Sequence, residues 1–298
     1  MYEDMGTLLN KGYGTWKRNM VIAVPFILDL MATIFFSLFA VTLFVIVFVM
    51  PEIASSTVAD NIPPEVYLEI LSSLLKENLL LFIAGTLFLL ILFLLIGSFF
   101  EAGAIGMCRL ALLSGDTSVG QMWASGRQHV LNLLLAKTLV GLIIMAGVIF
   151  LVPGVLSSDR LETLTTDPAS TGSVLIVLGT IAWFLYALVA SILLFFVEYA
   201  LVVDDLDPIS ALEKSLEFFR ENKTGVITII GIIVAISLAL EIFGSAISSV
   251  EALANVWSLI YLFISVLVIR PLTTIWITRM YMNRTGKELY SFDMYAFE

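Results

Sequence analysis

The stretch Asp207–Asn222, DPISALEKSLEFFREN, lies directly before a long apolar run of the chain. Asp207 is placed to accept hydrogen bonds from the first amide groups of a helix, and Pro208 suits the first helical turn because its missing donor would be unpaired there. Apolar residues recur at helical spacing, and the charged residues fall mostly on other faces. We therefore predict an amphipathic helix lying along the membrane interface. Its expected apolar face consists of Ile209, Leu212, Leu216 and Phe219.

The composition around this stretch is that of a membrane protein. Of the 298 residues, 60% are hydrophobic and 13% are charged, whereas soluble domains have about 45–50% apolar and about 25% charged residues. Lipid offers backbone groups no hydrogen-bond partner, so long apolar runs cross a bilayer as helices. We predict an all-α polytopic membrane protein with six transmembrane helices arranged as three hairpins. The predicted spans are Met20–Met50, Leu79–Cys108, Val130–Leu156, Ser173–Val203, Thr224–Ser248 and Ala252–Tyr281.

Segments similar to Asp207–Asn222 precede the first and third spans. Aligning Asn19 with Asn222 brings Trp16 onto Phe219, and placing Asn132 in the same register gives a weaker middle copy. Each unit is then an interfacial helix, a span outward, an outer loop and a span back. We predict a single membrane domain, residues 1–298, with repeats at 5–108, 116–203 and 207–282 and a short cytoplasmic tail at 283–298.

The middle copy also carries signals for a helix start. Ser118 and Gln121 have the spacing of a capping box. Trp16 and Trp123 occupy two of the three segments, and an indole prefers the headgroup region of a bilayer. We expect both tryptophans on interfacial helices.

The basic residues indicate the orientation of the chain. All lysines and arginines except Lys76 and Arg160 fall on one side of the six predicted spans. Because positive loops stay in the cytoplasm, we expect a multi-pass protein of the cell membrane with both termini cytoplasmic. The outer loop after the first span is acidic, and Pro64–Glu77 within it is predicted to form a short amphipathic helix.

Five ionisable residues lie within the predicted spans, close to their cytoplasmic ends. Charges at such depth usually face the interior of a helix bundle and pair with one another. One interpretation is a polar cavity open to the cytoplasm, which handles a solute, an ion or a lipid headgroup. The other is structural ion pairing, with long side chains reaching toward the interface. This candidate polar layer consists of Asp29, Glu101, Lys137, Glu198 and Arg270.

Two further patterns concern the shape and packing of the helices. Arg270–Pro271 predicts a kink, because proline leaves a carbonyl one turn earlier without its donor. Small residues between Gly97 and Gly106 favour close contact with a neighbouring helix.

Motifs for catalysis and for cofactor binding are missing. The sequence contains no phosphate-binding loop, HExxH motif or nucleophile elbow. Asp204, Asp205 and Asp207 form a tight carboxylate cluster, but Asp207 already has a capping role, and we predict no metal. The formal net charge of −10 argues against nucleic acid as a partner. We predict no enzyme activity and no cofactor.

The segment PISALEKSLEFFREN, together with Gly106–Asp116, resembles a group of uncharacterised prokaryotic membrane proteins with six helices, archaeal members included, that is grouped near the membrane domain of glycerophosphodiester phosphodiesterases. The shared pattern Pro-x-x-Ala-x-x-x-Ser falls on Pro208, Ala211 and Ser215. The resemblance implies six helices with interfacial segments. The phosphodiesterase activity of the named relatives resides in a separate soluble domain and is not carried over.

Two functional hypotheses follow. The first is a non-enzymatic accessory or scaffold protein whose interfacial helices contact membrane lipid and partner membrane proteins. The second is a small transporter or lipid-handling protein that uses the charged layer near the inner leaflet. A cavity lined by Arg270, Glu101 and Glu198 would favour the second, whereas tight ion pairs without a cavity would favour the first.

Overall fold

The computed structural model describes residues 2–50, 79–157, 171–248 and 251–290. Over these ranges the chain is helical and contains no strand. Six helical segments are long and apolar enough to cross a membrane, which confirms the all-α class and the six predicted spans. The predicted outer helix Pro64–Glu77 lies outside the described residues. The six segments are Met20–Val47, Leu79–Ser114, Val119–Leu156, Thr171–Asp204, Lys223–Ile247 and Ala254–Arg284.

The elements follow one another along the chain with few breaks. The first half contains α1 (Met5–Arg18), η1 (Met20–Ala23), α2 (Val24–Phe44), η2 (Val45–Val49), α5 (Leu79–Ser114), α6 (Val119–Ala146), η3 (Gly147–Leu151) and α7 (Val152–Leu156). The second half contains α9 (Thr171–Leu193), α10 (Val197–Asp204), α11 (Pro208–Glu221), α12 (Lys223–Ser248), α13 (Glu251–Ile264), η4 (Ser265–Ile269) and α14 (Arg270–Arg284).

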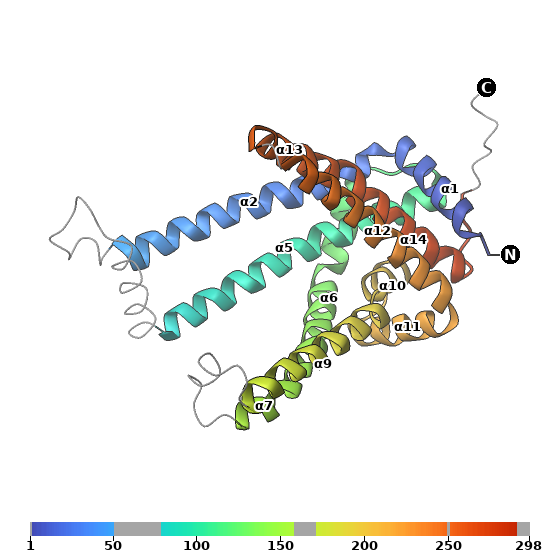
Figure 1. Cartoon of the computed structure of the whole chain (residues 1–298). Coiled ribbons are helices and arrows are strands. Elements are labelled where there is room, and N and C mark those ends of the chain that lie inside the picture. The colour runs from blue at the N-terminus through green and yellow to red at the C-terminus, as the bar shows by residue number, and fades with distance from the viewer. Residues whose placement is uncertain (1, 51–78, 158–170, 249–250, 291–298) are drawn as a thin grey trace.

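The helices diverge from a common region. In Figure 1, the α2–α5 pair and the α6–α7–α9 group extend away from each other, while α1, α10, α11 and α14 gather at the opposite end. The buried residues of α5 all lie between Ser98 and Leu112, in its second half. We call this compact end, formed by α1, α10, α11, α14, the second half of α5 and the first half of α6, the base.

The base has an aromatic centre. Phe196, Phe218 and Tyr281 come from three different parts of the chain, and their ring centroids lie 4.4 Å (Phe196–Phe218) and 5.1 Å (Phe218–Tyr281) apart. Aromatic pairs at such distances stabilise a core beyond the area they bury. The Tyr281 hydroxyl donates a hydrogen bond to Asp204 Oδ2 at 2.6 Å. These contacts join α14 to α10 and α11.

Proline explains several irregular segments. Pro25, Pro153 and Pro271 lie in the first turns of α2, α7 and α14, and a 3₁₀ or π-helical segment comes directly before each of these helices. Proline lacks an amide donor and its ring crowds the carbonyl one turn earlier, so the preceding turn tightens or widens. The kink predicted at Arg270–Pro271 therefore takes the form of the π-helical segment η4.

Close packing of α5 against α6 depends on small residues. A Cβ atom added at Gly106 would lie 2.2 Å from Ser125 Oγ, and one added at Gly103 would lie 2.7 Å from the Met122 side chain. The Ser125 hydroxyl donates to the Ala102 carbonyl at 2.8 Å. The predicted close contact thus occurs at Gly103 and Gly106. It does not occur at Gly97, where an added Cβ would meet nothing within 4 Å.

The sequence predicted a separate interfacial helix before the third span, and this prediction is wrong. Ser118 caps α6 by accepting a hydrogen bond from Gln121 N, as the capping pattern indicated. From there α6 continues without a break to Ala146. The polar residues Gln128, His129 and Asn132 lie within this helix without interrupting it, so the interfacial segment and the span form one helix.

The predicted apolar face of α11 is shifted. Asp207 accepts hydrogen bonds from the amides of Ile209 and Ser210, which confirms the cap. The fully buried residues are Ala211, Ser215 and Phe218, whereas Ile209 is 63% exposed. Leu212, Leu216 and Phe219 are partly buried beside them. Small residues let α11 approach α10 and α6, so protein rather than lipid covers the centre of this face.

The three segments of the predicted repeat can be compared by their caps and buried positions. Asp4 caps α1 as Asp207 caps α11, in the register that aligns Asn19 with Asn222. In the middle copy the cap is Ser118. Aligning Ser118 with Asp207 shifts the register by one residue from the alignment that pairs Asn132 with Asn222. The corresponding buried residues are Leu8, Gly12 and Thr15 in α1, Met122, Gly126 and His129 in α6, and Ala211, Ser215 and Phe218 in α11.

An ion pair fastens α1 to the end of α14. Arg279 is 2% exposed and donates to both Glu3 carboxylate oxygens, at 2.9 and 2.7 Å. Lys11 also contacts Glu3, at 2.9 Å. Burial alone would raise the pKa of the Glu3 carboxyl, but the hydrogen bonds from Arg279 and Lys11 outweigh it, so this pKa is lowered.

Candidate functional site at the charged cavity

Lys137 is the centre of the candidate site. It projects from α6, and its ammonium group bonds to Glu101 of α5 and lies 3.6 Å from Glu198 Oε1 of α10. One cation is therefore shared by two acids that come from different helices.

A second ion pair lies beside this triad. Arg270 Nη2 contacts Asp29 Oδ2 at 3.0 Å, linking the start of α14 to α2. The guanidinium also lies 4.9 Å from the centre of the Phe26 ring, a distance suited to a cation–π contact. Arg270 acts electrostatically on Glu101, so the two groups are neighbours. The structure thus brings all five residues of the predicted polar layer into one region.

The triad is open to a cavity of about 480 Å³. The side chains of Lys137, Glu101 and Glu198 are 20%, 35% and 28% exposed, and all three line this space. The volume falls within the ~300–1,000 Å³ range of small-molecule sites. The other lining residues are Val140, Gly141, Ile144, Ser191, Leu194, Phe195, Val197, Tyr199, Ile233, Thr273 and Ile277.

The lining of the cavity combines the charged triad with mostly apolar residues. One face of α6 lines the cavity over ~10 Å, at 1.5 Å per residue. We call its residues the α6 stripe: Lys137, Val140, Gly141 and Ile144. Opposite walls come from α9, α12 and α14. Arg270, which we expected in such a cavity, is not among its lining residues.

Ser215 holds the helix break that positions Glu198. Between α9 and α10 the helix is interrupted at Leu194–Phe196. The Ser215 hydroxyl donates to the Leu193 carbonyl at 3.0 Å and accepts from the Phe196 amide at 3.2 Å. A side chain that bonds to the freed backbone groups is a recognised cause of such breaks. No glycine or proline marks this site, so only the serine in the repeat pattern could have indicated it.

The acidic cluster at the start of α11 is divided among separate contacts. Asp204 accepts from Tyr281 and pairs with Lys287 at 2.8 Å. Asp205 lies 3.0 Å from His129 Nε2 and also accepts from Gln128. Asp207 is the helix cap. Among the described residues, no group of three or more His, Cys, Asp or Glu side chains is arranged to hold a metal ion.

The two predicted interfacial tryptophans have different surroundings. Trp16 is half-buried and packs against the core, with its ring 5.7 Å from that of Tyr13. Trp123 is 44% exposed and lies 5.1 Å from the Phe99 ring on α5. Neither lines the charged cavity.

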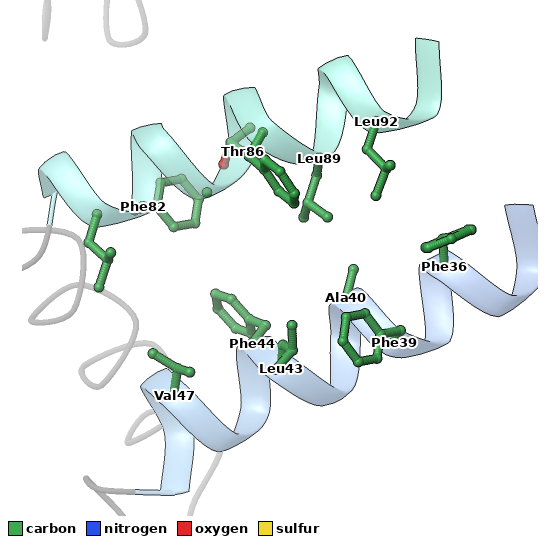
Figure 2. A pocket seen from close by; sticks show the side chains of 13 residues that line it. Phe36, Phe39, Ala40, Leu43, Phe44, Val47, Phe82, Thr86, Leu89 and Leu92 are labelled. Carbon is green, nitrogen blue, oxygen red and sulfur yellow. The ribbon is translucent and has the colours of Figure 1, made fainter. Parts of the chain in front are cut away.

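A second cavity, of about 470 Å³, lies between α2 and α5. Figure 2 shows Phe36, Ala40 and Phe44 on one side and Phe82 and Leu89 on the other, facing each other across the gap. Its lining is apolar except for Thr86. This groove offers no charged group for recognition, so the charged cavity is the better candidate site.

The fold and the cavity define an all-helical membrane protein with six spans and a charged cavity between helices. The chain belongs to the family described as a domain of unknown function, DUF7847, whose model matches residues 18–281. It is also similar to an uncharacterised protein of Archaeoglobus fulgidus, at 24% identity over 98% of this chain and 99% of the relative. No solved structure matches the chain. These findings fit the archaeal part of the resemblance and show no link to glycerophosphodiester phosphodiesterases.

Proposed function

We propose that this protein binds a membrane lipid in the charged cavity and handles it there. The observation that carries the proposal is the cavity's mixed lining, which combines the Lys137 triad with mostly apolar walls. A lipid has the same combination, because a polar headgroup adjoins alkyl chains. A water-soluble ion would gain nothing from the apolar walls, so a lipid-handling role fits better than transport of such an ion.

Filling the cavity should abolish lipid binding. Gly141 lines the cavity, and a Cβ added there would meet nothing within 4 Å. We expect Gly141→Leu to remove at least nine-tenths of the labelling by a photoreactive lipid in reconstituted vesicles, because the new side chain occupies the ligand's space. Mass spectrometry of the labelled protein measures the yield and locates the labelled residues.

Two glycines provide matched controls for this variant. Gly231 is exposed on α12 and also has open space around it, and Gly85 lines only the apolar groove between α2 and α5. Gly231→Leu and Gly85→Leu should retain labelling at the α6 stripe. Equal labelling of this stripe in Gly141→Leu and in the parent would refute the proposal.

A different observation favours an accessory or scaffold function. The α2–α5 pair leaves large apolar side chains exposed on both helices, among them Phe35, Leu38, Leu80 and Phe88. In a membrane such surfaces are covered by lipid or by helices of other proteins. Co-purification of one stoichiometric partner, lost in Gly85→Leu but kept in Gly141→Leu, would favour this function over lipid handling.

We further propose that both termini are cytoplasmic and that the protein resides in the cell membrane. The support is the concentration of basic residues at the base, where Lys11, Arg279 and Lys287 lie. Cys108 is fully buried, so a thiol reagent should label an introduced cysteine without labelling Cys108.

Cysteine labelling from outside intact cells tests this orientation. An impermeant maleimide should label Ser157→Cys, at the end opposite the base, and should leave Glu217→Cys of α11 unlabelled until the cells are opened; both residues are exposed. Ser215 is unsuitable for this purpose because it is fully buried. Labelling of Glu217→Cys alone in intact cells would reverse the proposed topology.

A relation to the membrane domain of glycerophosphodiester phosphodiesterases is also a proposal. It is supported by the short pattern at Pro208, Ala211 and Ser215, of which Ala211 and Ser215 are fully buried at the base. We propose no catalytic step for the chain.

A further inference from the structure

The charge balance of the cavity determines which headgroup it can take. Glu101, Lys137 and Glu198 are the charged residues in its lining, so two acids face one base. Lys137 is already bound to both acids, and the neighbouring Arg270 is paired with Asp29 at 3.0 Å. Counted by residue type, the two acids of the triad outnumber the one base that they share.

The geometry leaves these acids accessible to a ligand. The Glu101 and Glu198 side chains remain 35% and 28% exposed after their contacts with Lys137. A cation placed in the cavity would meet both carboxyl groups, whereas an anion would meet the same two groups with Lys137 already engaged. Like charges brought together in this way are a common means of excluding a ligand.

Aromatic side chains reinforce the preference for a cation. Phe195 and Tyr199 line the same cavity, next to Glu198 in the chain. Ammonium groups are attracted to the faces of aromatic rings, and quaternary ammonium ligands are recognised in this way. Beyond these rings, Val140, Ile144 and Ile233 provide an apolar wall for an alkyl chain.

We propose that the cavity binds a cationic amphiphile, whose amine or quaternary ammonium group lies against Glu101 and Glu198 and whose alkyl chain lies along the α6 stripe. The proposal rests on the lipid-binding function above and specifies its ligand. It assigns Glu101 and Glu198 to headgroup recognition and assigns Gly141 and Ile144 to the chain.

Equilibrium dialysis with labelled dodecyltrimethylammonium tests the ligand class. The full chain, in an uncharged maltoside detergent, should bind this probe saturably, and Glu198→Gln should weaken the binding at least tenfold. Glu241→Gln is the matched control, because Glu241 lies on α12 and does not line the cavity. Thermal unfolding of each variant establishes that it is folded.

Two competitors separate the features of the ligand. Dodecanoate has a chain of similar length and the opposite charge, and it should not displace the probe at tenfold excess. Tetramethylammonium carries the headgroup alone and should compete at least a hundredfold more weakly, which distinguishes a membrane amphiphile from a soluble cation. Equal competition by dodecanoate, or unchanged binding in Glu198→Gln, would overturn the proposed ligand class.

The Gly141→Leu variant distinguishes an error in the proposed ligand class from an error in the proposed lipid-binding function. If dodecyltrimethylammonium does not bind but Gly141→Leu still abolishes labelling by a photoreactive lipid, then the cationic preference is wrong and the lipid site remains. If Gly141→Leu changes neither measurement, both proposals are wrong.

Discussion

Replacing Lys137 with methionine should lower the free energy of unfolding by about 2–3 kcal/mol, less than the ~3–5 kcal/mol typical of a fully buried ion pair, because the three side chains of the triad are 20–35% exposed. Methionine keeps most of the length of the lysine side chain but removes its charge. Glu101 and Glu198 would then lose the cation that both contact. Equilibrium unfolding in detergent, followed by circular dichroism, measures the loss.

Two further variants separate this effect from a general loss of charge. Lys214 of α11 pairs with Glu217 at the surface, with side chains 36% and 55% exposed, so Lys214→Met should change stability by less than ~0.5 kcal/mol. The double variant Lys137→Met with Glu101→Gln should be more stable than Lys137→Met alone, because one uncompensated acid is removed. A double variant less stable than Lys137→Met would contradict the shared-cation arrangement.

Replacing Gly106 with leucine should destabilise the protein by about 3 kcal/mol or more, at the upper end of the range for overpacked cores. The first added carbon would lie 2.2 Å from Ser125 Oγ and 2.3 Å from Ser125 Cβ, so α5 and α6 would have to separate. Separation would also break the hydrogen bond from Ser125 to the Ala102 carbonyl. The same unfolding measurement applies.

Gly97 is the control for this substitution. It lies on the same helix, and an added Cβ would meet nothing within 4 Å. Gly97→Leu should therefore leave stability unchanged or raise it slightly, since glycine is a poor helix former. If both variants lose equal stability, the effect comes from the helix itself and not from the α5–α6 contact.

Local chemistry made some of these features predictable from sequence. Hydropathy identified the six spans, and the side chains of Asp207 and Ser118 indicated the starts of α11 and α6. Both signals depend on a few neighbouring residues. The shifted face of α11 shows the limit of this approach, because helical spacing defines a stripe but not the neighbour that covers it. Ile209 fits the stripe and is nevertheless exposed.

The candidate site was harder to predict, because it depends on contacts between distant helices. The sequence indicated that charges within the spans would pair, but the grouping of Lys137 with two acids and of Arg270 with Asp29 depends on how each helix is rotated. The break at Leu194–Phe196 has no local signal and is held by Ser215 of another helix. The cavity is lined by residues of α5, α6, α9, α10, α12 and α14, which no single segment reveals.

The position of the buried residues of α5 has a mechanical consequence. With 36 residues, α5 is ~54 Å long, and its buried residues lie in its second half. Its other half, ~27 Å long, behaves as a lever arm, so a tilt of about 5° at the base would move the distant end by about 2.5 Å. A ligand that shifts α5 at Glu101 would therefore change the cross-sectional area of the protein on the side of the membrane opposite the base.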